Sequence, residues 1–167
     1  NRHPGGDCDK RTDLYFLQSS DRGDTWRMLD DTDVAIPLDR ADDPARIRAF
    51  SDEGLNVYVK DINFDAAGNP VALVVTSPGF QPGPDGDPRT WTVAHGTADG
   101  WRFHEVTRST HNYDTGSIYC EPDGTWRIIG PTEPGPQHWG TGGEMAVWTS
   151  GDRGRSWEMA RQITHDS

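Results

Sequence analysis

A short polar segment in the last third of the chain carries the residue types of acid–base chemistry. His111, Tyr113 and Asp114 fall within the run His-Asn-Tyr-Asp-Thr-Gly-Ser. A histidine can act as general base, a tyrosine hydroxyl as general acid, and a carboxylate can orient either of them. The alternative is structural: His111 and Tyr113 bond at a junction between strands, and Asp114 caps a turn. We predict His111 and Tyr113 as catalytic residues.

Positive and aromatic side chains elsewhere in the chain suit an anionic sugar. Arg127 lies on an expected strand from which it can reach an acidic substrate, and it is the third predicted catalytic residue. A cross-strand ion pair with a neighbouring acid is the alternative for Arg127. The predicted substrate-binding residues all lie in long irregular segments: His3, Arg89, Glu133, His138 and Trp139. Trp139 either stacks on a sugar ring or anchors its proline-rich loop.

Repeated turns indicate which elements position these residues. Residues 19–26 and 150–157 share the pattern Asp-x-Gly-x-(Ser/Thr)-Trp, and each stands between two strand-like segments. In such a hairpin turn the aspartate accepts backbone N–H groups and the glycine takes a positive φ. Trp101 and Trp157 are 56 residues apart, and so are Gly68 and Gly124. Two landmarks with one period predict a four-stranded repeat.

The predicted fold is all-β: a partial β-propeller of about two and a half four-stranded antiparallel blades with Asp-box hairpins. An outer hairpin is expected at about residues 12–28, a complete blade at about 57–107 and another at about 113–164. The whole chain, residues 1–167, is then a single segment of the propeller. The remaining blades are expected from chain outside this segment or from other subunits.

Strand parity assigns the connections to two faces. The tight turns within blades, including those of Asp21 and Asp152, fall on one face and are predicted to be structural. The longer connections fall on the opposite face, where binding and catalytic groups tend to lie. The chemistry-bearing residues collected there are His3, Arg11, Arg89, His111, Tyr113, Asp114, Glu133, His138 and Trp139.

Charge and length exclude several partners. The net charge of −11 argues against nucleic acid, because affinity for phosphates depends on Lys and Arg. It also argues against an anionic membrane surface, and no apolar run approaches the roughly 20 residues of a spanning helix. The chain contains seven tryptophans, which argue against disorder.

The two cysteines leave three alternatives open. Cys8 and Cys120 form two free thiols, one long-range disulfide, or part of a metal site. Cys8 with Asp7, Asp9 and His3 offers ligands for a structural zinc or calcium ion, although the spacing matches no zinc signature. The sequence therefore predicts no definite cofactor.

The turns, residues 111–117 and residues 125–136 together resemble BNR-repeat (Asp-box) proteins of the sialidase-like β-propeller superfamily. The nearest resemblance is to ulvan-lyase-like propellers of bacterial polysaccharide degraders, over nearly the whole chain. It implies a secreted or periplasmic protein with an acidic polysaccharide or glycan as partner. Such lyases act by β-elimination, with His and Tyr as base and acid and an Arg near the uronate carboxylate. By matching position, the resemblance assigns these catalytic roles first to His111 and Arg127. Tyr113 and His3 are the weaker matches.

Two other functions stay open as alternatives. A non-catalytic glycan-binding propeller needs only aromatic rings and hydrogen-bond donors, such as Trp139, Tyr113 and Arg89. A sialidase-type glycoside hydrolase needs an arginine triad and a Tyr–Glu pair, and it carries a Phe-Arg-Ile-Pro motif that is absent here. Similarity to the sialidase fold alone is not evidence that this chain hydrolyses glycosides. If the protein is an enzyme, we favour a polysaccharide lyase over a hydrolase.

Overall fold

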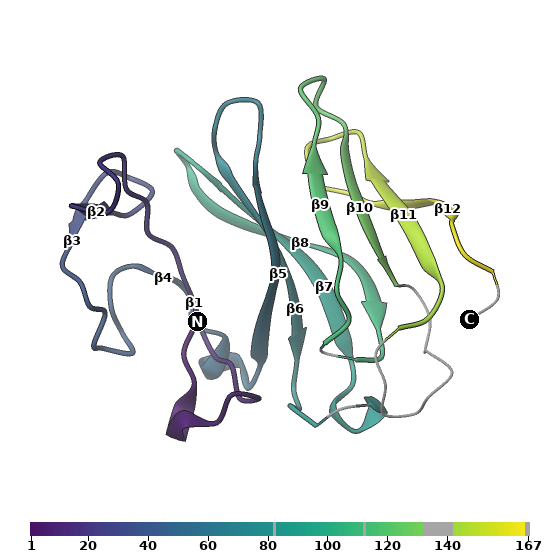
Figure 1. The fold of residues 1–167 in the computed structure, drawn as a ribbon, viewed down its shortest axis with the longest axis horizontal. Helices are drawn as coiled ribbons and strands as arrows, with labels where there is room; N and C mark the ends of the chain where they lie inside the picture. The colour runs from purple at the N-terminus through teal and green to yellow at the C-terminus, as the bar shows by residue number, and fades with distance from the viewer. Residues whose placement is uncertain (82, 112, 132–141, 166–167) are drawn as a thin grey trace.

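The computed structural model of the chain describes residues 1–81, 83–111, 113–131 and 142–165. Antiparallel strands form two four-stranded and two two-stranded sheets (Figure 1). Helix in the described residues is limited to three short 3-10 turns, Pro4–Gly6, Phe50–Glu53 and Gly83–Gly86. None of these is long or apolar enough to cross a membrane. The chain is therefore an all-β protein.

The first large sheet consists of β5 (Asn56–Phe64), β6 (Pro70–Ser77), β7 (Arg89–Thr97) and β8 (Gly100–Ser109), paired in chain order. Strand β6 is buried along its whole length. Its sequence is a continuous apolar run rather than an alternating one, which is typical of a strand covered on both faces.

The second large sheet consists of β9 (Ser117–Cys120), β10 (Trp126–Pro131), β11 (Met145–Ser150) and β12 (Glu158–Gln162), again in chain order. The two large sheets span nearly the same residues as the repeats expected at 57–107 and 113–164. Their interpretation as propeller blades stays a prediction.

One apolar core joins the two large sheets. Its buried members are Val71, Leu73, Val75, Trp91, Val93, Ile118, Trp126 and Ile128. The close approach depends on Gly116, because a Cβ there would lie 2.6 Å from the carbonyl oxygen of Ile129 and 2.7 Å from the Trp91 ring. The interface therefore requires a glycine at this position.

The N-terminal third differs in detail from the expected hairpin at 12–28. It contains β1 (Leu14–Tyr15), β2 (Trp26–Arg27), β3 (Asp33–Val34) and β4 (Arg46–Arg48). Gln18 and Arg27 exchange two backbone hydrogen bonds across the turn, but β1 pairs with β4 and β2 with β3. Leu14 belongs to a second core with Phe50 and Val57, which holds β1 against the outer face of the first sheet.

The connections separate into two ends of the sheets. The tight turns joining β5 to β6 and β9 to β10, and the turn leading into β2, lie at the top of Figure 1. The connections from β6 to β7 and from β8 to β9, with the 3-10 turn Pro4–Gly6, lie at the bottom (Figure 1). We call the second end the long-loop end.

The two repeated turns share one hydrogen-bond pattern. The Asp21 carboxylate accepts from the backbone N–H of Thr25 at 2.9 Å and from its hydroxyl at 2.6 Å. Asp152 accepts from Ser156 in the same way, at 2.9 and 2.7 Å. These bonds lower the pKa of both carboxyls below the usual range. The bonds lie inside the turns, in agreement with the structural role predicted for Asp21 and Asp152.

Candidate functional site

The N-terminal segment is bound to the start of β5 at the long-loop end. Arg2 and Thr12 exchange two backbone hydrogen bonds of 2.8 and 2.9 Å. The backbone N–H of Val57 donates to the carbonyl oxygen of Arg11 at 2.7 Å, and the Asn1 side chain donates to the Val57 carbonyl at 2.7 Å. Residues between Arg2 and Thr12 are thereby held beside the strand that carries Tyr58.

Asp9 connects three segments that are distant in sequence. Its backbone carbonyl accepts a hydrogen bond of 2.7 Å from the Tyr58 hydroxyl on β5. Its carboxylate accepts a hydrogen bond from the Tyr113 hydroxyl in the β8–β9 connection. The two tyrosine rings lie 6.0 Å apart between centroids. Sequence patterns predicted a catalytic role for Tyr113 and only a possible role as a metal ligand for Asp9, and they predicted no role in a site for Tyr58.

His111 and Tyr113 lie together, as expected if both belong to one site. The His111 ring is 5.8 Å from that of Tyr113, and its Nδ1 accepts the Tyr113 backbone N–H at 3.1 Å. A ring nitrogen that accepts a hydrogen bond carries no proton, so the proton of neutral His111 lies on Nε2. Only 4% of the residue is exposed. In this arrangement His111 presents a hydrogen-bond donor rather than a basic lone pair.

Two cations lie beside the tyrosine pair. The guanidinium carbon of Arg11 is 5.6 Å from the Tyr58 ring centroid and 5.7 Å from that of Tyr113. The Lys60 ammonium is 5.7 and 5.9 Å from the same centroids. Arg11 uses its Nε to donate to the carbonyl oxygen of Cys8 at 2.9 Å. Within the described residues, its terminal NH2 groups make no hydrogen bond and can receive an anion.

The surroundings shift two ionisable groups of the cluster. Burial, and then the hydrogen bond to Asp9, raise the pKa of Tyr113 to about 12, so its hydroxyl stays protonated at neutral pH. Burial lowers the pKa of Lys60 to about 8. The carboxylate of Asp114 opposes this effect, and the charge of Arg11 adds to it. Lys60 can therefore change its protonation state near physiological pH.

Asp114 is a buried carboxylate behind the cluster. Only 1% of it is exposed, and its Oδ1 accepts the backbone N–H of Gly142 at 3.0 Å. Its own backbone N–H donates to the His111 carbonyl at 3.2 Å. Asp114 thus fixes the β8–β9 connection to the segment that leads into β11, and it supplies negative charge near Lys60.

Of two further predicted residues, Arg127 lies away from this cluster, whereas Arg89 lies close enough for the charges of Tyr58 and Asp114 to act on it. Arg89 is fully buried and donates to the Gln81 carbonyl and, at 3.2 Å, to the Asp87 carboxylate. Arg127 forms an ion pair with Glu121 beside the tight turn from β9 to β10. That turn lies at the opposite end from the β8–β9 connection (Figure 1). Arg127 thus forms the ion pair given above as its alternative, and its catalytic role stays a prediction.

The remaining predicted residues are not joined to the cluster. His3 is exposed on the N-terminal segment, beside the 3-10 turn. Glu133, His138 and Trp139 lie outside the described residues. Their substrate-binding roles stay predictions.

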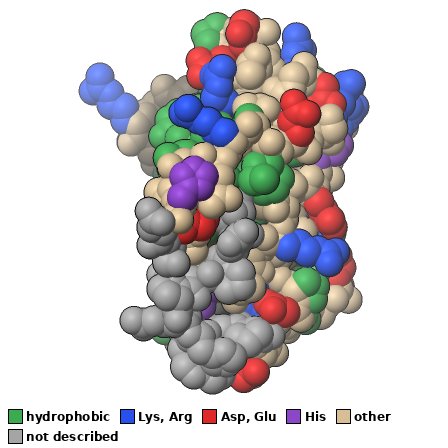
Figure 2. Space-filling model, turned by 90° about the vertical axis from the view of Figure 1, so that its right-hand side faces the viewer, with side chains coloured by type: hydrophobic (Ala, Val, Ile, Leu, Met, Phe, Trp, Pro, Cys, Tyr) green, Lys and Arg blue, Asp and Glu red, His purple; other side chains and the backbone are tan. Residues whose placement is uncertain are grey.

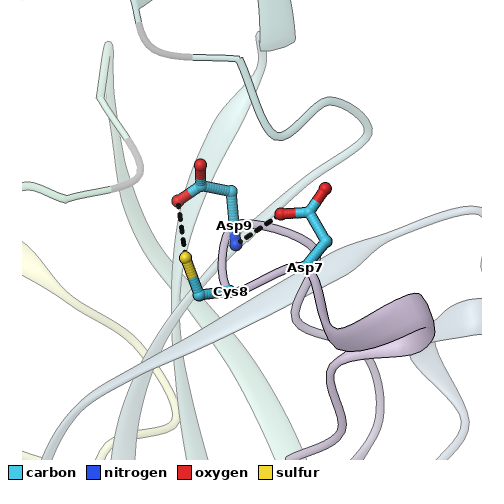
Figure 3. Close-up of side chains that lie close together, drawn as sticks. All are labelled: Asp7, Cys8 and Asp9. Carbon is cyan, nitrogen blue, oxygen red and sulfur yellow. Dashed lines mark hydrogen bonds between the residues drawn. The ribbon is translucent and has the colours of Figure 1, made fainter.

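The possible metal loop contains Asp7, Cys8 and Asp9, whose ligand atoms lie within 4.8 Å of one another (Figure 3). The Cys8 thiol points toward Asp9 at 3.9 Å, and the Asp9 backbone N–H donates to Asp7 at 3.0 Å. Structural zinc is held by four Cys, His or carboxylate ligands, and calcium by six to eight oxygens. One oxygen of Asp9 is already bonded to Tyr113, so the set fits neither ion well. Cys8 and Cys120 are both free thiols.

No known protein-family profile matches the chain, and no curated protein matches it in sequence. Among the solved structures that match its fold, two have TM-scores of 0.70 and 0.69 at 14% identity. Both are described as an ulvan lyase of a new polysaccharide lyase family, PL25, one of them bound to -[GlcA(1-4)Rha3S]-. The match covers 92% of this chain and 34% of each lyase. The chain therefore has a fold found in polysaccharide lyases and spans about a third of their length.

Proposed function

We propose that the chain is a segment of a carbohydrate-active protein that cleaves an acidic polysaccharide by β-elimination. The observation that carries this proposal is the position of Tyr113, which joins His111 and Asp9 beside the terminal NH2 groups of Arg11, which make no hydrogen bond within the described residues. The fold shared with the ulvan lyases supports the same choice. In this proposal Arg11, whose guanidinium carbon lies 5.7 Å from the Tyr113 ring centroid, is the cation that binds the substrate.

β-Elimination requires a cation, a base and an acid around one sugar. The cation binds the uronate carboxylate, the base removes the proton from C5, and the acid protonates the oxygen that leaves C4. The terminal NH2 groups of Arg11 suit a carboxylate, with which a guanidinium pairs in a bidentate manner. The protonated hydroxyl of Tyr113 suits the acid.

The proposal includes a larger ring. The two large sheets would be blades at about 57–107 and 113–164 of a sialidase-like propeller, and residues 12–28 the outer hairpin of a third, with Asp-box turns. Its support is the apolar surface left on both outer sheet faces: Ile62 is 59% exposed, Phe64 56% and Tyr119 47%. Figure 2 views the molecule from the side of the second sheet, where apolar side chains lie among charged ones. Further blades, from chain outside these residues or other subunits, would cover them in a secreted or periplasmic protein.

The decisive experiment is an assay on defined polymers. Purified protein is incubated with glucuronate-rich polysaccharides and with neutral glycans, and the ultraviolet absorbance of unsaturated uronate is followed. We expect this absorbance to rise with the acidic polymers only. If none of the uronate polymers gives an unsaturated product with the chain or with a longer protein that contains it, the lyase assignment is wrong.

A glycan-binding protein without turnover is the second candidate, and one observation favours it. The Tyr113 hydroxyl is already bonded to Asp9, while the paired rings and cations offer a surface on which a sugar can stack. Titration calorimetry with the same polymers distinguishes the two functions. Binding without unsaturated product would identify a binding protein, whereas binding with product would identify a lyase.

A further inference from the structure

Lys60 occupies a β-bulge in strand β5. Val59 faces Val74 and Asp61 faces Leu73 in the neighbouring strand, so Lys60 is the extra residue between these pairs. A bulge bends its strand and redirects the side chain that it carries. Here the ammonium group is placed beside both tyrosine rings of the candidate site. Bulges of this kind occur frequently next to active sites.

The groups around Lys60 come from three segments. Among the described residues they include Tyr58 of β5, Arg11 of the N-terminal segment, and Tyr113 and Asp114 of the β8–β9 connection. The charge of Arg11 repels the Lys60 ammonium, and this repulsion is relieved when Lys60 loses a proton. Burial acts in the same direction, and Asp114 acts against both, which leaves the pKa of Lys60 at about 8.

His111 and Tyr113 each take part in a hydrogen bond within the cluster. His111 accepts the Tyr113 backbone N–H at Nδ1, which leaves a donor at Nε2. Tyr113 donates its hydroxyl proton to Asp9, and its raised pKa keeps the phenol protonated. An elimination at this site still requires a group that can accept a proton near neutral pH.

We propose that Lys60 is the base that removes the C5 proton of a uronate, an inference that rests on the proposed function above. The lone pair of the neutral amine binds the proton from C5, and the electrons of the C5–H bond form the C4=C5 double bond. The C4–O4 bond breaks, and O4 receives the proton of the Tyr113 hydroxyl, which turns from Asp9. The Lys60 ammonium then returns one proton, through solvent, to the Tyr113 phenolate. No water, oxidant or reductant is consumed.

The first test measures the titration of Lys60 directly. The chain contains two lysines, Lys10 and Lys60, so lysine-selective isotope labelling gives two side-chain signals in NMR spectra. Lys10 is the internal control. It lies outside β5, on the N-terminal segment, and its side chain is partly exposed and pairs with Asp7 at 3.6 Å. We expect the Lys60 signal to titrate near pH 8 and well below that of Lys10. Titration of both signals together near the ordinary lysine value would overturn the proposal.

The second test separates proton transfer from charge. Lys60→Arg keeps the positive charge but cannot release its proton near neutral pH. We expect kcat/KM to fall at least about 100-fold and its rise between about pH 7 and 9 to disappear. The matched Lys10→Arg variant should retain both the rate and the pH profile. Full activity of Lys60→Arg would show that only the charge is needed, and the proposal would be wrong.

The third test is chemical rescue. In Lys60→Ala, added primary amines should restore part of the lost activity, with a rate that rises with the basicity of the amine. A residue that merely supports the fold would not respond in this way. Where a variant does not fold, the titration of the unmodified chain decides. Wild-type protein without any unsaturated product would overturn both this proposal and the proposed function, whereas an ordinary pKa with an active wild type would overturn this proposal alone.

Discussion

The hydroxyl of Tyr113 donates a hydrogen bond to the carboxylate of Asp9, which lies 104 residues earlier in the chain. The same Asp9 binds the Tyr58 hydroxyl through its backbone carbonyl. The N-terminal segment is therefore part of the candidate site rather than an extension beside it.

Replacing Tyr113 with phenylalanine tests the proposed acid. The ring and its packing remain, but the proton donor is lost, so we expect kcat to fall about 100- to 10,000-fold with little change in KM. The free energy of unfolding should fall by about 1 kcal/mol, because the Asp9 carboxylate loses one partner. Tyr119→Phe is the matched control, since Tyr119 is 47% exposed on β9. Equal activity of the two variants would contradict the role of Tyr113.

The two arginines can be compared in one pair of variants. Arg11→Met should raise KM for a uronate polymer at least about tenfold, because a charge-assisted carboxylate contact is lost. Arg127→Met removes an ion pair that is more than a third exposed on each side, and activity should change little. Steady-state kinetics on both variants checks this. The opposite result, with Arg127 required and Arg11 dispensable, would restore the sequence-based assignment.

The repeated turns should depend on pH through their aspartates. The pKa values of Asp21 and Asp152 are lowered mainly by hydrogen bonds from Thr25 and Ser156. The stabilisation is therefore complete above the unfolded-state pKa of about 4 and is lost as the pH falls through the folded-state pKa. Asp152→Ala should lower Tm at pH 7, and its difference from wild type should shrink in more acidic solution.

The control for the turn is Asp99→Ala, since Asp99 lies in an exposed turn and its carboxylate pairs with Arg102 at a long distance of 3.4 Å. We expect little change in Tm for this variant at any pH. An equal loss for Asp99→Ala and Asp152→Ala would show that the bonds within the repeated turn are not what stabilises it.

A pair of glycine variants isolates the packing of Trp126. Gly154 and Gly68 both have positive φ, at +78° and +82°. A Cβ at Gly154 would lie 2.6 Å from the Trp126 ring, whereas a Cβ at Gly68 would meet nothing within 4 Å. Both alanine variants should lose about 1–2 kcal/mol to backbone strain, and Gly154→Ala should lose about 1–3 kcal/mol more to overpacking. Urea unfolding measures the difference, and equal losses would contradict the contact.

Local sequence patterns predicted the elements that depend on local chemistry. The turns of Asp21 and Asp152 were recognisable because their side-chain bonds span only four residues. The burial of β6 and the positive φ at Gly124 were likewise predictable from short stretches of sequence, an apolar run and a turn glycine. The separation of tight turns from long connections then followed from strand parity alone.

The content of the site was only partly predictable, because it depends on contacts between distant segments. His111, Tyr113 and Arg11 were placed at the correct end. Asp9 and Tyr58 carry no local signal for a shared hydrogen-bond network, and a bulge at Lys60 cannot be derived from an alternating pattern. The burial of Arg89 and the ion pair of Arg127 likewise depend on neighbours that spacing does not reveal.

The bulge in β5 also has a consequence for how the length of this strand can vary among descendants of the chain. Beyond Lys60, Asp61 accepts the backbone N–H of Ile118 at 2.9 Å, and Asn63 donates to the carbonyl of the same residue at 2.8 Å. Deleting the extra residue, Lys60, would leave Asp61 and Asn63 on the face toward β9, because the pairing with β6 on either side of Lys60 is already in register. A gene lineage that keeps this pair of sheets can therefore lose one residue from β5 and retain its polar contacts to β9, but it would lose the side chain that the bulge places beside the tyrosine rings.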